Sequence, residues 1–350
     1  VRLMPPRVQF ATTDDGVRIA YTVTGEGPPL FWLPHFLASH VQLEWEFPQK
    51  FVYTRLAEQF TVVRFDCRGL GLSDRDVEDI SLEARMRDLE AVARKIGAAR
   101  FAVVGIEGGG NLATAYAIAH PERVSHLVLI NWSPRFRDEA SGARLSALGL
   151  LVRQDWEMLA QNIGGVAFGY DAPAAAGYAR LVRASVNQPM AIRYGDLFVE
   201  EDLLPLLPEV AVETLVLHSE ENSYASETSA RTVAASIPDA SFRTFEGGLP
   251  RHIFQLLDAI KDFVPAAPAA RAMPVGPAPL PDAVPLTERE LEILVLVARG
   301  LSNREMADQL VLSPRTIERH LENLYRKTGA RNRAEATAYA FTRGLVEQPG

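Results

Sequence analysis

Short apolar runs alternate with amphipathic helical patterns along the first 264 residues of the chain. Eight of these runs have the length and composition of β-strands, at about 8–12, 17–23, 30–33, 61–66, 101–105, 126–130, 214–218 and 241–245. Helical periodicity lies between the later runs, at about 82–96, 111–120, 227–236 and 252–263. The later runs are almost continuously apolar, which is typical of parallel strands buried on both faces. The alternation predicts an α/β fold with a doubly wound, mostly parallel sheet.

The region from about 133 to 210 contains no clear strand pattern and shows several helical patterns instead. It is rich in aromatic residues, which include Trp156, Phe168, Tyr178, Tyr194 and Phe198. An aromatic helical insertion between two core strands predicts a lid over the carboxyl ends of the strands.

Residues 265–285 have the composition of a linker, with seven prolines in 21 residues. Proline at this density favours an extended, semi-rigid spacer, because the residue cannot continue a helix or donate to a sheet. The spacer would reach roughly 65 Å when fully extended, at about 3.1 Å per residue. It separates a large domain, 1–264, from a small one, 286–350.

The small domain shows three helix starts at short spacing. Thr287 and Glu290 form a capping-box pattern, and Ser302 and Glu305 repeat it. Ser313, followed by Pro314, then opens a third helix with a hydroxyl cap and a proline at the first helical position. Three closely spaced helices predict a small all-α domain with a helix-turn-helix.

The third of these helices has an apolar back and a cationic front. At about 100° per residue, Ile317, Leu321 and Leu324 fall on one stripe. The opposite face carries Arg315, Arg319 and Arg326 with Asn323 beside them, and one flank carries Thr316, His320 and Lys327. A solvated basic face would give the same wheel, but the preceding run of capped helices favours a helix that enters the major groove of DNA.

This domain resembles the C-terminal domain of LuxR-type regulators over the stretches 286–290, 300–307, 313–320 and 331–336. The resemblance implies that the third helix enters the major groove and that a fourth helix, about 333–341, pairs two copies. The DNA-contacting residues are expected to be Asn303, Arg315, Thr316, Arg319, His320, Asn323, Lys327 and Arg333. Glu318 and Glu322 stand where some relatives carry basic residues that contact bases. The DNA sequence that those relatives recognise therefore cannot be assigned to this protein.

Composition and charge place limits on this interpretation. The chain has 350 residues, of which 47% are hydrophobic and 23% charged, as expected for a globular protein with a sizeable core. A net charge of −8 argues against binding nucleic acid along the whole chain, so DNA contact is expected to be local to the C-terminal domain. The single cysteine, Cys67, the absence of a signal-peptide pattern and the absence of a long apolar run lead us to expect a cytoplasmic protein that contacts no membrane.

The large domain resembles the α/β-hydrolase family over about residues 9–264. Its strongest motif is the stretch 64–74, Arg-Phe-Asp-Cys-Arg-Gly-Leu-Gly-Leu-Ser-Asp, and the stretch 103–109 matches a nucleophile elbow. The elbow position that holds serine in the Gly-x-Ser-x-Gly pattern holds Glu107 here. By the same resemblance Asn222 stands at the position of the acid and His252 at that of the histidine, while His35 and Phe36 occupy the oxyanion loop.

Serine-type acyl transfer needs a hydroxyl that a histidine can deprotonate, and the carboxylate of Glu107 offers none. We therefore expect no catalytic residue and no ordinary esterase or peptidase activity. We also expect neither a metal nor a cofactor. One enzymatic alternative stays open. Haloalkane dehalogenases and epoxide hydrolases attack with an elbow aspartate, and Glu107 with His252 could act in that way. A decayed site that binds no ligand is a further alternative.

In the interpretation that we favour, the large domain has kept a ligand pocket but has lost catalytic turnover. Open α/β sheets bind ligands beyond the carboxyl ends of their strands. The expected ligand-contacting residues are His35, Phe36, Glu107, Gly108, Trp132, Phe168, Phe198 and His252. A pair formed by Glu107 and His252 in an apolar cavity would suit a small, mostly apolar effector. The sequence thus predicts a homodimeric, ligand-responsive transcription regulator, with a constitutive DNA-binding protein, whose large domain only dimerises, as an alternative.

Overall fold

The computed structural model describes residues 5–33, 37–46, 49–135, 142–168, 173–220, 225–245, 249–265, 288–298, 301, 303–310, 312–328 and 336. The chain divides into two compact units, Val1–Ala272 and Met273–Gly350, and the boundary falls inside the segment predicted as a linker. Most of that segment lies outside the described residues.

The first unit is built on an eight-stranded sheet with the order β1-β2-β4-β3-β5-β6-β7-β8. The first two strands, β1 (Gln9–Thr12) and β2 (Arg18–Thr24), are antiparallel to each other, and β2 is antiparallel to β4. All other neighbours are parallel. The remaining strands are β3 (Pro29–Leu33), β4 (Thr61–Phe65), β5 (Phe101–Ile106), β6 (Val124–Ile130), β7 (Thr214–Ser219) and β8 (Ala240–Phe245). All eight predicted strands are confirmed.

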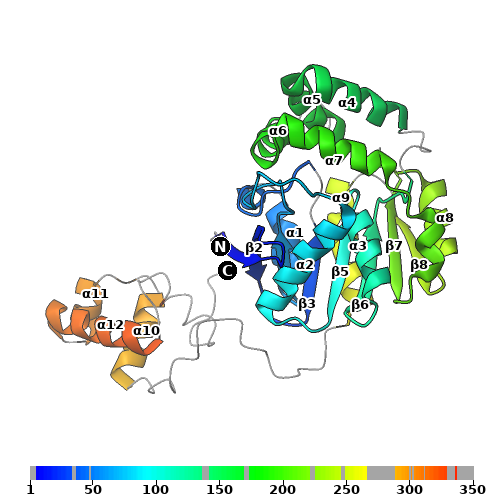
Figure 1. Ribbon diagram of the computed structural model, residues 1–350. Coiled ribbons are helices and arrows are strands. Elements are labelled where there is room, and N and C mark those ends of the chain that lie inside the picture. The colour runs from blue at the N-terminus through cyan, green and yellow to red at the C-terminus, as the bar shows by residue number, and fades with distance from the viewer. Residues whose placement is uncertain are drawn as a thin grey trace. The chain divides into compact units, whose positions relative to one another are not determined.

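Helices cover both faces of this sheet, as Figure 1 shows. A hydrophobic cluster on one face joins the sheet to α1 (Gln49–Leu56) and α9 (Leu249–Phe263). The other face packs against α2 (Leu82–Ile96), α3 (Gly109–Ala119) and α8 (Glu227–Ser236). The strand β7 is buried along its whole length, which explains the apolar run Leu215–Leu217 at its centre.

The insertion between β6 and β7 is helical, as predicted. It contains α4 (Gly142–Gln154), α5 (Trp156–Phe168), α6 (Pro173–Ser185) and α7 (Gln188–Glu200), followed by a 3₁₀ helix at Leu204–Glu209. A second 3₁₀ helix, η1, spans Leu43–Glu46. Asn187 caps α7 by accepting a hydrogen bond from the amide of Met190 (3.0 Å). Figure 1 shows these four α-helices grouped at one end of the sheet.

The second unit contains three described helices, α10 (Glu288–Ala298), α11 (Asn303–Leu310) and α12 (Pro314–Thr328). They enclose a small core of their own. Ser313 caps α12 as predicted, because its hydroxyl accepts a hydrogen bond from the amide of Thr316 (3.1 Å). Ile317, Leu321 and Leu324 are buried in this core, which confirms the apolar stripe. The fourth helix predicted at about 333–341 lies outside the described residues apart from Ala336.

Candidate functional site

Glu107 occupies a sharp turn between β5 and α3. Its φ of +47° is unusual for a residue with a side chain. The Glu107 amide donates to the carbonyl of Ile130 on the neighbouring strand (2.9 Å), and the Glu107 carbonyl accepts from the amide of Gly110 (2.9 Å). A Cβ atom on Gly105 would lie 2.7 Å from the Ala113 Cβ, so the strand and helix can approach this closely only with glycine there. The chain therefore builds the predicted nucleophile elbow, with a half-buried carboxylate at its apex.

A second strained residue follows the next strand. Asn131, directly after β6, has a φ of +49° and is fully buried. Its side-chain oxygen accepts a hydrogen bond from the amide of Ser219 at the end of β7 (2.8 Å). The sequence analysis did not identify Asn131, although asparagine is among the residue types that most readily adopt a left-handed conformation.

Trp132, predicted to line a pocket, packs tightly against the start of α3. A Cβ on Gly110 would collide with the Trp132 indole, which is 2% exposed. The indole N–H donates to the side-chain oxygen of Asn111 (2.7 Å). These contacts account for Trp132 as a core residue, and its contact with a ligand stays a prediction.

The end of the lid helix α7 is tied to the helix that begins at the elbow. Asn111 donates its side-chain N–H to Glu201, the capping residue directly after α7 (2.6 Å). Arg85 on α2 forms an ion pair with the same carboxylate, and both side chains are nearly buried. The carboxylate thus joins α2, α3 and α7 at one point.

The loop after β4 supports the junction of α6 and α7. The hydroxyl of Tyr194 donates to the backbone carbonyl of Arg68 (2.7 Å), and the amide of Gly71 donates to the carbonyl of Ser185 (2.7 Å). Gly69 has a φ of +80° and lies against Met190, so a side chain there would be strained and crowded. The family-like stretch 64–74 therefore serves as the support of the lid.

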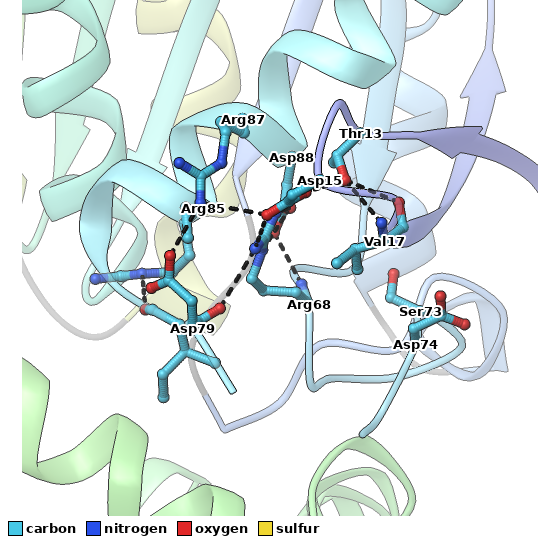
Figure 2. Close-up of polar contacts among 12 residues, drawn as sticks. Thr13, Asp15, Val17, Arg68, Ser73, Asp74, Asp79, Arg85, Arg87 and Asp88 are labelled. Atoms are coloured by element: carbon cyan, nitrogen blue, oxygen red, sulfur yellow. Dashed lines mark hydrogen bonds and ion pairs between the residues drawn. The ribbon is translucent and has the colours of Figure 1, made fainter. Parts of the chain in front are cut away.

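This loop is held in turn by buried charges (Figure 2). The guanidinium of Arg68 is 1% exposed and lies between Asp88 (2.8 Å) and Asp15 (2.7 Å). Hydrogen bonds from Arg68 hold the pKa of Asp15 well below its usual range. Burial raises the pKa of Asp66 to about 6, although the hydroxyl of Ser39 and backbone amides donate to its carboxyl group.

The other predicted residues of this site are only partly placed. Gly108 is buried directly after Glu107, and Phe198 is 6% exposed in the core shared with the lid. His252 lies in α9 and Phe168 ends α5, but the positions of their side chains lie outside what the structure describes. His35, Phe36 and Asn222 lie outside the described residues. The pairing of Glu107 with His252 therefore stays a prediction.

In the second unit, α12 presents several of the predicted DNA-contacting residues. On α12, Arg319 is exposed, while the side chains of Thr316, His320 and Asn323 are half-buried. Asn303, the first residue of α11, is half-buried as well. The hydroxyl groups of Thr316 and Ser313 are within hydrogen-bond distance (2.7 Å). The side chain of Arg315 and the whole of Arg333 lie outside what the structure describes.

Lys327 occupies a different environment. Its ammonium group forms an ion pair with Glu290 of α10 (2.7 Å), and the two side chains are 17% and 5% exposed. A buried carboxylate needs such a partner, because an uncompensated charge in the core is strongly destabilising. Lys327 thus joins two helices in this structure, a role that differs from the DNA contact predicted for it.

Comparisons with known proteins agree with the division of the chain into two units. The profile of the family "Bacterial regulatory proteins, luxR family" matches residues 284–340, and the profile "alpha/beta hydrolase fold" matches residues 33–158. The chain joins an α/β-hydrolase-fold domain to a LuxR-family domain. Within the described residues no group of histidine, cysteine and carboxylate side chains could hold a metal ion, and none of the described helices is long and apolar enough to span a membrane.

Individual relatives match only part of the chain. The LuxR-family domain is 40% identical over 62 residues to the response regulator protein VraR of Staphylococcus aureus, a match that covers 18% of this chain and 30% of that protein. Another match is 31% identical over 121 residues to epoxide hydrolase 3 of Xenopus tropicalis and covers 34% of this chain and 32% of that protein. The chain therefore spans about a third of the length of these relatives.

Solved structures share the fold of the first domain. An esterase from Exiguobacterium antarcticum superimposes with a TM-score of 0.63 at 21% identity and covers 72% of this chain and 97% of its own. An enol-lactonase from Burkholderia xenovorans LB400 gives a TM-score of 0.61 at 20% identity, over 73% of this chain and 99% of its own. At this level of identity the likeness establishes the α/β-hydrolase fold alone.

Proposed function

We propose that this protein is a ligand-responsive transcription regulator. Its α/β-hydrolase-fold domain binds a small, mostly apolar molecule without turning it over, and its LuxR-family domain binds double-stranded DNA. As a homodimer, it would place two copies of α12 in half-sites about one helical turn apart. The ligand would act by binding one arrangement of the dimer better than another, with couplings typically of about 1–3 kcal/mol.

The observation that carries this proposal is Glu107 at the apex of an intact elbow. A strained left-handed residue costs roughly 1–3 kcal/mol, so it persists only where the surrounding structure holds it in place. Here the turn has the hydrogen bonds and close packing of an elbow, but the apex has no hydroxyl to act as a nucleophile. The arrangement supports a site that presents a polar group to a bound molecule and lacks the chemistry of acyl transfer.

The DNA-binding part of the proposal is supported by the exposed face of α12. Arg319 lies on this face, opposite the buried stripe that fixes the orientation of the helix. A helix with an apolar back in its own small core and cations in front can enter a major groove without loss of packing.

The test combines binding, turnover and DNA association on the full chain. Small amphipathic compounds are screened by thermal shift. The compounds that raise the unfolding temperature of the α/β-hydrolase-fold domain are then tested for hydrolysis and for their effect on a duplex-DNA mobility shift. We expect compounds that bind, remain chemically unchanged and alter DNA binding. Rapid consumption of the bound compound would refute the non-catalytic role, and binding without any effect on DNA would refute the regulatory one.

A second candidate is residual chemistry of the epoxide hydrolase or dehalogenase kind. It is favoured by the 31% identity to epoxide hydrolase 3 over 121 residues and by the carboxylate at the elbow. In such chemistry a carboxylate oxygen of Glu107 would displace halide from carbon, or open an epoxide, and form an ester that water later cleaves. Incubation with styrene oxide or 1-bromobutane, followed by peptide mass analysis, would reveal that ester as a mass increase on Glu107.

A further inference from the structure

Asn131 carries a buried donor that the described structure leaves without an acceptor. The residue is fully buried, its amide N–H donates to the carbonyl of Leu217 (2.9 Å) and its Oδ1 accepts from the amide of Ser219 (2.8 Å). The side-chain Nδ2 has no hydrogen-bond partner among the described residues. A buried polar group of this kind is costly, and a bound molecule that supplied an acceptor would offset that cost.

The position of Asn131 points to the same site as Glu107. In the sheet, β6 lies between β5 and β7, so Asn131 follows the strand next to the one that ends in the elbow. The amide of Glu107 donates to the residue directly before Asn131, Ile130. Among the described residues these two, Glu107 and Asn131, are the non-glycine residues with a positive φ. Backbone strain of this kind is concentrated at functional sites, and both residues lie where α/β sheets bind ligands.

We propose that Asn131 is a ligand-contacting residue and that its Nδ2 donates a hydrogen bond to an oxygen atom of the bound molecule. This inference rests on the proposed function of the site and gives the chemical class of its ligand. Asn131 supplies a donor, and the carboxylate of Glu107, in the turn that follows the adjacent strand, supplies an acceptor. The complementary ligand carries a carbonyl or hydroxyl oxygen next to an N–H or O–H group, as neutral amides and hydroxy-carbonyl compounds do. A carboxylate is disfavoured, because the charge of Glu107 would repel it.

The test uses the full chain, labelled with ¹⁵N, and three probes of nearly equal size. Phenylacetamide offers an acceptor and a donor, methyl phenylacetate offers acceptors alone, and phenylacetate is an anion. The side-chain signal of Asn131 is assigned by its loss in Asn131→Gly, because glycine adopts a φ of +49° without strain. Asn131→Asp is a second variant, which keeps an acceptor for the amide of Ser219 and removes the Nδ2 donor.

We expect phenylacetamide to shift the Asn131 signal and to bind more tightly than the ester, with phenylacetate the weakest. Its affinity should fall roughly fivefold in Asn131→Gly and Asn131→Asp, the effect of one hydrogen bond between neutral groups. Thr114→Val is the matched control. The hydroxyl of Thr114 is also fully buried and without a hydrogen-bond partner among the described residues, but Thr114 lies inside α3, away from the strand ends. This variant should bind phenylacetamide as the wild type does.

Two results would overturn the inference and leave the proposed function standing. One is a probe that binds the domain while the Asn131 signal stays unchanged. A permanently bound water that accepts the hydrogen bond from Nδ2 would give this result. The other is equal affinity in the wild type and in both Asn131 variants. If none of the three probes and no compound of the thermal-shift screen binds, the proposed function itself fails, and this inference fails with it.

Discussion

The ion pair between Lys327 and Glu290 gives the sharpest test of how the DNA-binding unit works. The two groups are 2.7 Å apart, and the Glu290 side chain is 5% exposed. In Lys327→Met the carboxylate loses a buried partner, which costs about 3–5 kcal/mol when such a pair is broken from one side. A module of this size is stabilised by only about 3–9 kcal/mol in total, so the variant should lose most of its stability.

Hydrogen exchange measured by mass spectrometry on the full chain is the assay. Amides of α12 that exchange through global opening of the unit should exchange at least about 100-fold faster in Lys327→Met, because roughly 1.4 kcal/mol corresponds to a factor of ten. Exchange in the sheet of the first unit should not change. The double variant Glu290→Leu with Lys327→Met should recover most of the protection, because apolar residues can replace a buried ion pair.

Arg319→Ala is the matched control, because Arg319 lies on the same helix but is exposed. It should weaken binding to duplex DNA and lower the salt dependence of that binding, while the exchange of α12 stays at the wild-type rate. The reasoning is refuted if Lys327→Met behaves like Arg319→Ala, with unchanged exchange and weaker, less salt-dependent DNA binding. Lys327 would then contact DNA, as the sequence predicts.

Three further predictions concern the first unit. Glu107→Ser should show at most trace hydrolysis of p-nitrophenyl butyrate, and turnover as fast as that of a typical esterase would contradict a site without an intact triad. Gly110→Ala should lower stability by roughly 1–3 kcal/mol in urea unfolding, because the new methyl group meets Trp132, whereas Gly149→Ala, with open space around it, should be neutral or stabilising. Burial raises the pKa of Asp66 to about 6, so the folded state binds this proton more tightly than the unfolded state does. The resulting contribution to the free energy of unfolding is lost as pH rises from about 4 through 6. The stability of the wild type relative to Asp66→Asn should therefore fall by roughly 2–3 kcal/mol between pH 4 and pH 8, and a constant difference would exclude this assignment.

The sequence was sufficient for the architecture, because each strand and helix is specified by a local pattern. The predicted strand at 214–218 and helix at 82–96 match β7 and α2 to within one residue. The buried stripe of α12 followed from helical periodicity alone. The predicted division into two units needed only the proline-rich composition of one segment.

The features that the sequence did not predict depend on contacts between distant residues. The helical wheel places Lys327 on the flank of α12, but its ion pair is with Glu290, 37 residues earlier. The link from Glu201 to Asn111 spans 90 residues and depends on how the lid lies against α3. The left-handed conformation of Asn131 is set by strand pairing and by the amide of Ser219, and neither is visible in a local pattern.

These distant contacts also bear on the alternatives to a sensor. If the large domain only paired two copies, nothing in that role would require two strained residues and an unsatisfied buried donor at the ends of neighbouring strands. Glycine at 107 or 131 would relieve the backbone strain, and an apolar residue at 131 would remove the unsatisfied group. Each of these costs lies at the sheet edge where a ligand would bind, and binding would offset the cost of the unmet donor. The strained backbone and the unmet donor at this edge are therefore what we expect of a site that, as we propose, is completed by a molecule from outside the chain.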